Sequence, residues 1–131
     1  DLGIRLLLPP QECEMIDLAG GRAACVVGPG ARSFVTPRKM VLDGAAMLVF
    51  WEQPSNLPIL RARALENRVF VIAVNDSFAA VIGPDGAILS YTSVESPIPA
   101  FTIISLGEAA DKEVAPRTDL LAERQPATYR F

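Results

Sequence analysis

Few groups in the sequence could perform nucleophilic or acid-base chemistry, because it contains two cysteines and no histidine. Cys25 lies in the apolar run AACVV, which predicts a buried and unreactive thiol. Cys13 lies between Glu12 and Glu14, whose negative charges disfavour the thiolate form. Without histidine, the chain offers no Ser-His-Asp triad, no Cys-His pair and no histidine-ligated zinc. We therefore expect no metal site, and proton transfer would depend on carboxylates, lysines, arginines and tyrosines.

The segment GRAACVVGPGAR, residues 21–32, reads as a buried strand that runs into a loop where an enzyme could place a nucleophile. Gly28, Pro29 and Gly30 instead put proline second and glycine third in a tight turn, which favours type II. This run is too short to cradle a phosphate, and the sequence contains neither GxGxxG nor GxxxxGK[ST]. The loop is therefore predicted to be a turn rather than a nucleotide site.

Two helices are predicted among the elements that would position these residues. Thr36 as capping residue, Pro37 at the first helical position and Gly44 after the last turn indicate a short helix over 37–43. A second helix follows Ser55 or Asn56 as its cap, with proline in its first turn.

Strands alternate with these helices, and the order predicts an α/β fold with at least one mainly parallel stretch. The acidic segment QECEMID is expected to be a loop or an edge strand. Asp85 belongs to the turn PDG between two apolar runs, which indicates a hairpin. The expected strands and hairpin are 4–10, 21–27, 45–50, 69–75, 79–90 and 100–106.

Length and composition favour one globular domain. The chain has 131 residues, half of them apolar, and a formal net charge of -3. It has no basic excess that would indicate nucleic acid binding, and its apolar runs are far shorter than the roughly 20 residues of a membrane helix. We expect a cytoplasmic protein with an α/β domain over 1–106 and an extended tail over 107–131 that packs on a partner subunit. Because the chain begins with DLG, we expect a processing site or an upstream portion.

Four stretches resemble the carbon-nitrogen hydrolase superfamily of nitrilases and amidases, and specifically its C-terminal half. GRAACVVGPGAR is similar to the family's strand that runs into the nucleophile, usually of the form GRIGVLICYDLR. RARALENRVFVIAVN at 61–75 resembles the family's helix and following strand, and is the most specific of the four. VIGPDGAIL at 81–89 is similar to its hairpin, and TDLLAERQPATY at 118–129 to its closing segment. Together they cover most of the chain.

The resemblance implies a four-layer α-β-β-α sandwich, dimers formed through helices and the C-terminal tail, a Glu-Lys-Cys catalytic set and no cofactor. In the ungapped match the family's cysteine falls on Gly28 and its following arginine on Arg32. The family's lysine falls on Ile4, or on Arg5 after a one-residue slip, and Glu12 matches an accessory glutamate. The first catalytic glutamate lies upstream of residue 1. The catalytic positions present here are therefore degenerate.

Other charged and aromatic residues have both a functional and a structural explanation. Arg61, Arg63 and Glu66 could line the relic of a pocket, or they could form a solvated helix face with ion pairs. Trp51 and Glu52 stand where the family's strand usually ends in Pro-Ser. We expect this change at the end of the strand to exclude the family's usual substrates.

The sequence leaves three functions open. The leading hypothesis is a catalytically inactive domain with a structural, assembly or regulatory role, in which a second copy or an upstream domain covers the open face of the half-fold. The second is a sensor of small amides or carboxylates, in which Arg32 and the amides around Gly28 and Gly30 contact an anion. The third is a fragment of a hydrolase of amides or nitriles whose missing groups come from upstream.

Overall fold

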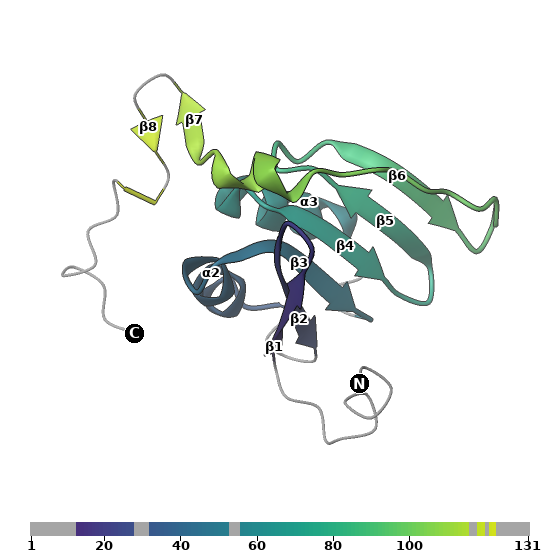
Figure 1. Ribbon diagram of the computed structural model, residues 1–131. Coiled ribbons are helices and arrows are strands. Elements are labelled where there is room, and N and C mark those ends of the chain that lie inside the picture. The colour runs from purple at the N-terminus through teal and green to yellow at the C-terminus, as the bar shows by residue number, and fades with distance from the viewer. Residues whose placement is uncertain (1–12, 28–31, 53–55, 116–117, 120, 123–131) are drawn as a thin grey trace.

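A six-stranded mixed sheet forms the centre of the chain in the computed structural model, which describes residues 13–27, 32–52, 56–115, 118–119 and 121–122 (Figure 1). Its strands, in the order in which they lie side by side, are β1 Cys13–Leu18, β2 Gly21–Val27, β3 Ala45–Trp51, β4 Phe70–Val74, β5 Phe78–Ile82 and β6 Ile88–Ser93. β2, β3 and β4 are parallel, whereas β1, β5 and β6 join antiparallel. The predicted α/β class with a parallel stretch is confirmed.

Several predicted elements have the expected places. The edge-strand alternative for the acidic segment is correct, because among the described strands β1 lies at one edge of the sheet and pairs with β2. The PDG turn joins β5 to β6, and Asp85 Oδ1 accepts a hydrogen bond from the backbone N–H of Ala87 at 3.0 Å. The strand predicted over 4–10 and the turn predicted over 28–30 lie outside the described residues.

Helix α3 (Leu57–Asn67) connects β3 to β4 and begins as predicted. Asn56 is its N-cap, and the side-chain oxygen accepts a hydrogen bond from the backbone N–H of Ile59 at 3.2 Å. The helix ends at Arg68, which has a left-handed φ of 51°. Figure 1 shows α3 behind the sheet.

Helix α2 (Val35–Leu42) connects β2 to β3 and begins earlier than predicted. Thr36 is not its cap but lies inside the helix, and Ser33 Oγ accepts a hydrogen bond from the backbone N–H of Val35 at 3.1 Å. Pro37 is tolerated because the N–H groups of the first turn have no partner within the helix. Gly44 follows the last turn with a φ of 103°, as the sequence indicated.

The two faces of the sheet differ in burial. Among the side chains that point toward the helices, Val26, Leu48, Phe50, Val71 and Ile82 are at most 1% exposed. Neither α2 nor α3 covers the opposite face, where Ala23, Met47 and Phe70 are buried near the amino ends of the parallel strands. Nearer the carboxyl ends the side chains are half-buried, and Trp51 is 53% exposed. We call this side the open face; besides the three buried residues, the strand register assigns to it Cys25, Val27, Val49, Trp51, Ile72, Val74, Ala79, Val81, Ser90 and Thr92.

The chain after β6 crosses the open side of the sheet, and the strand predicted over 100–106 is wrong. Residues 97–105, all within the described chain, form no strand, and the short 3₁₀ helix η2 (Leu106–Ala110) follows. η2 packs on β3 with Ala109 only 2% exposed, and Figure 1 shows it in front of the sheet. The segment lies over a face rather than along an edge, so its backbone has no strand to pair with.

The described tail continues as two short strands, β7 (Glu113–Ala115) and β8 (Thr118–Asp119), which pair with each other. Lys112, between η2 and β7, donates hydrogen bonds from Nζ to the carbonyl oxygens of Asn67 and Arg68 at 3.1 and 2.8 Å. This contact attaches the tail to the end of α3. The domain boundary at residue 107 stays a prediction.

Candidate functional site

The carboxyl ends of the three parallel strands meet at one edge of the sheet. β2 ends at Val27, β3 at Trp51 and β4 at Val74, and the register pairs Trp51 with both of the others. Ligands of open α/β sheets bind beyond the carboxyl ends of the strands. This edge is therefore the candidate site, and in the sequence Gly28 directly follows the last residue of β2.

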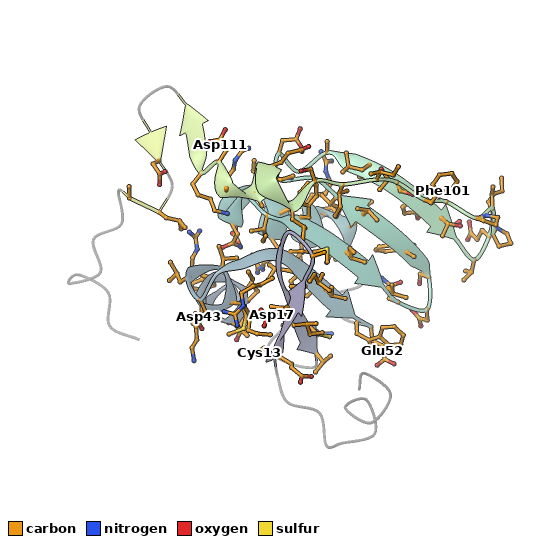
Figure 2. The ribbon with its side chains drawn as sticks, in the orientation of Figure 1. Cys13, Asp17, Asp43, Glu52, Phe101 and Asp111 are labelled. Atoms are coloured by element: carbon orange, nitrogen blue, oxygen red, sulfur yellow. The ribbon has the colours of Figure 1, made fainter. Side chains whose placement is uncertain are left out.

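Glu52, directly after β3, is held in an uncommon backbone conformation. Its φ is 65°, in the left-handed region that non-glycine residues rarely adopt, and its backbone N–H donates to the carbonyl of Val74 at 2.7 Å. Backbone outliers of this kind cluster at ligand sites. The Glu52 side chain is exposed at this edge (Figure 2), and Trp51, the last residue of β3, is also exposed.

Asn75, directly after β4, is a site residue that the sequence reasoning missed. Its Oδ1 accepts hydrogen bonds from the backbone N–H groups of Ser77 and Phe78, both at 2.9 Å. Its Nδ2 is buried and has no hydrogen-bond partner in the described part of the chain. A buried donor without a partner costs about 1–3 kcal/mol, so a ligand oxygen at this edge would relieve a penalty. The run Asn-Asp-Ser after a buried strand was the available signal.

Arg32, shortly before α2, is anchored by α3. Its carbonyl accepts a hydrogen bond from Arg63 Nη2 at 3.2 Å, while Arg63 Nη1 binds Glu66 Oε1 at 2.8 Å. Arg61 Nε donates to the carbonyl of Gly86 at 2.7 Å. In these contacts Arg61 and Arg63 link α3 to neighbouring segments, while Glu66 pairs with Arg63 within the helix.

The two cysteines lie on opposite faces of the sheet. Cys13 pairs with Val26, which faces the helices, whereas Cys25 pairs with Glu14 and faces the open side. Burial, and after it the charge of Glu14, raises the pKa of the Cys25 thiol, which opposes thiolate formation. Cys25 therefore lacks the electrostatic support of a nucleophile.

The remaining predicted site residues, Ile4, Arg5, Glu12, Gly28 and Gly30, lie outside the described residues. Within the described ranges, no three His, Cys, Asp or Glu side chains are grouped as a metal site would require. The described helices are all too short or too polar to cross a membrane.

Several solved structures of amidases and carbon-nitrogen hydrolases superpose on this chain. A carbon-nitrogen hydrolase from Helicobacter pylori G27 superposes with a TM-score of 0.74 and 20% identity, over 92% of this chain and 52% of that chain. The fold is nitrilase-like. An amidase from Nesterenkonia sp. AN1 matches with a TM-score of 0.60 and 18% identity, over 79% of this chain and 47% of that chain. Nit3 of Saccharomyces cerevisiae, a member of the nitrilase superfamily, matches with a TM-score of 0.56 and 17% identity, over 66% of this chain and 38% of that chain.

The likeness is one of fold, since the identities are 17–20%. The nitrilase-like chain spans about half the length of the solved structures that it matches. No family model matches the sequence, and no curated protein matches it. The predicted resemblance and fold class are confirmed at this level.

Proposed function

We propose that this nitrilase-like chain has a structural, assembly or regulatory role and no hydrolytic activity of its own. The observation that carries the proposal is the residue after β2, where the sequence match places the family's cysteine and this chain has Gly28. Amide or nitrile cleavage of the family's kind needs a thiolate to attack carbon, and glycine cannot form that covalent intermediate. A general acid-base group and a cation for the developing anion are also needed.

The two cysteines offer no substitute in this proposal. Cys25 lies inside β2 on the open face, with its pKa raised by burial and by Glu14. Cys13 lies on the neighbouring strand and faces the helices. A thiol inside a strand of a packed sheet cannot approach a substrate at the strand ends.

An activity assay with the purified chain tests the proposal. We expect no turnover of a panel of aliphatic amides, nitriles and carbamoyl amino acids, and no change on substitution Cys25→Ser or, as the matched control, Cys13→Ser. Hydrolysis that is lost in Cys25→Ser and kept in Cys13→Ser would show a working nucleophile and overturn the proposal.

A second candidate is a sensor of small amides or carboxylates, favoured by the unpartnered Asn75 Nδ2 and the strained Glu52 at the strand ends. Asn75 would donate to the ligand, and Arg32 would hold a carboxylate. Thermal unfolding with the same compounds tests it, since a ligand that binds the folded state stabilises it. A rise in melting temperature that Arg32→Ala abolishes supports the sensor, whereas no rise with any compound rejects it.

A further inference from the structure

Lys112 is one of the two lysines in the sequence, and its amine is held at the end of α3. It lies where the chain passes from η2 to β7 (Figure 1). Nζ donates hydrogen bonds to the carbonyl oxygens of Asn67 and Arg68 at 3.1 and 2.8 Å, and the side chain is half-buried. Carbonyls at the end of a helix have no partner within the helix, so the contact satisfies them and fixes the position of the amine.

Two arginines bring further positive charge to the same place. Arg68 follows α3 and Arg38 lies on α2, and both charges act on the amine of Lys112. Arg38 Nη2 donates to the carbonyl of Glu66 at 2.6 Å, and Arg68 Nη1 donates to that of Pro84 at 3.3 Å. Three cationic side chains from separate parts of the chain are thus held near the end of one helix. A cluster of one sign of charge attracts ligands of the opposite sign.

The surroundings of the Lys112 amine favour its neutral form. Burial, followed by the charges of Arg68 and Arg38, lowers its pKa to about 8, and Asp119 on β8 acts in the opposite direction. At a pH of about 7.5, about a quarter of such amines are neutral, against about a thousandth at the ordinary pKa of 10.5. A neutral amine has two N–H groups and one lone pair. Because both N–H groups can be donated to the two carbonyls, the lone pair is directed away from them.

We propose that Lys112 is a modification site, at which the amine takes an acyl group from an acyl phosphate. The amine attacks the carbonyl carbon of the donor and forms a C–N bond. The C–O bond to the phosphate breaks, the phosphate leaves with that electron pair, and one amine proton passes to it. Arg38 and Arg68 favour this class of donor, because guanidinium groups bind phosphate. The modification does not depend on the proposed function.

Acylation changes the contact that attaches the tail. The product is an amide, which has no charge and a single N–H group, so it can donate to only one of the carbonyls of Asn67 and Arg68. The other carbonyl loses its hydrogen bond, and a half-buried position must accommodate the acyl group. We therefore expect β7 and β8 to separate from α3 more readily in the acylated chain.

Reaction of the purified chain with acetyl phosphate tests the modification, and mass spectrometry of its peptides locates the acetyl groups. Lys39 is the control within the same molecule, because it is exposed on α2. A neutral acetyl donor, p-nitrophenyl acetate, is the matched control for the charge of the leaving group. It measures the reactivity of the amine without the attraction of the arginines for phosphate.

We expect acetyl phosphate to modify Lys112 at least about tenfold faster than Lys39 near neutral pH. The larger neutral fraction favours Lys112 by about 200-fold, and the weaker nucleophilicity of a less basic group, as known for thiols, reduces this by about tenfold. The preference should be smaller with p-nitrophenyl acetate. Equal rates at the two lysines, or faster reaction of Lys39, would overturn the proposal. An equal preference with both donors would show that the assigned class of donor is wrong.

Hydrogen exchange tests the effect on the tail. Lys112→Gln places a neutral amide at the position, and Lys39→Gln makes the same change on α2. We expect faster exchange over residues 113–115 and 118–119 in the acetylated chain and in Lys112→Gln, but not in Lys39→Gln. Circular dichroism checks that both variants are folded. Unchanged exchange of these residues in the acetylated chain would refute the release of the tail.

Discussion

Replacing Arg63 by alanine tests whether α3 holds Arg32 in place shortly before α2. The Arg63 side chain is only 13% exposed, and its guanidinium spans from Glu66 on the same helix to the carbonyl of Arg32. We expect Arg63→Ala to lower the free energy of unfolding by about 2 kcal/mol. The free energy of unfolding of Arg63→Lys should lie between those of the unchanged protein and Arg63→Ala, because an ammonium cannot reproduce the planar fork of a guanidinium.

The magnitude follows from the contacts of this side chain. The pair with Glu66 contributes only about 0.5 kcal/mol, because that carboxylate is 37% exposed and screened by water. The charged hydrogen bond to the Arg32 carbonyl contributes about 1.5 kcal/mol, and the buried methylenes about 1 kcal/mol more. Arg63 Nε is buried without a partner among the described residues, and removing it offsets the loss by about 1 kcal/mol, because its desolvation penalty disappears.

Urea unfolding followed by circular dichroism measures this loss. With a slope of about 2 kcal/mol per molar urea, the midpoint should fall by about 1 M. Lys39→Ala, which removes an exposed cation from α2, is the control and should change stability by less than about 0.5 kcal/mol. Hydrogen exchange at residues 32–35 should accelerate in Arg63→Ala alone. A midpoint equal to that of Lys39→Ala, with unchanged exchange, would refute the anchoring role.

Three further changes give measurable outcomes. Asn56→Ala removes the cap of α3 and should cost about 1 kcal/mol in urea unfolding; an unchanged midpoint would show that the cap is dispensable. Leu48→Ala, at a site with no exposure, should cost about 3 kcal/mol, against less than about 1 kcal/mol for the 42% exposed Leu42→Ala. Burial lowers the pKa of the Lys112 amine to about 8; the positive charges of Arg68 and Arg38 add to this effect, and the negative charge of Asp119 partly opposes it. The unfolded chain binds the proton of the Lys112 amine more tightly than the folded chain does. The free energy of unfolding should therefore rise between pH 8 and 10.5, by about 1 kcal/mol after solvent screening is allowed for. Lys112→Met should lack that rise. Parallel pH curves for the two proteins would contradict the shift.

The elements that local chemistry determines were predictable. Asn56 with a proline after it caps α3, and Asp85 with Gly86 closes the hairpin, because both depend on contacts within a few residues. The run AFTIISL at 100–106 has strand composition, yet it forms no strand. Composition reports that a segment is extended and apolar, whereas pairing depends on whether it reaches a sheet edge.

The candidate site was harder to predict. The carboxyl ends of β2, β3 and β4 could be expected to meet, because parallel strands align. The left-handed backbone of Glu52 depends on its hydrogen bond to Val74, which is distant in sequence. The contacts of Asn75 Oδ1 are local in sequence and could have been predicted. The residue was missed because the burial of its unpartnered Nδ2 depends on the folded structure.

The strand order bears on how such a chain can form its structure. Each strand of the sheet from β1 to β6 pairs with the strand that precedes or follows it in the sequence. The antiparallel pairs join strands that are separated by short turns, so little chain entropy is lost before their pairing is rewarded. The parallel pairs β2–β3 and β3–β4 each enclose a helix, and pairing across such a connection is slower. We therefore expect the antiparallel units β1–β2 and β4–β5–β6 to form before α2 and α3 bring the parallel strands together.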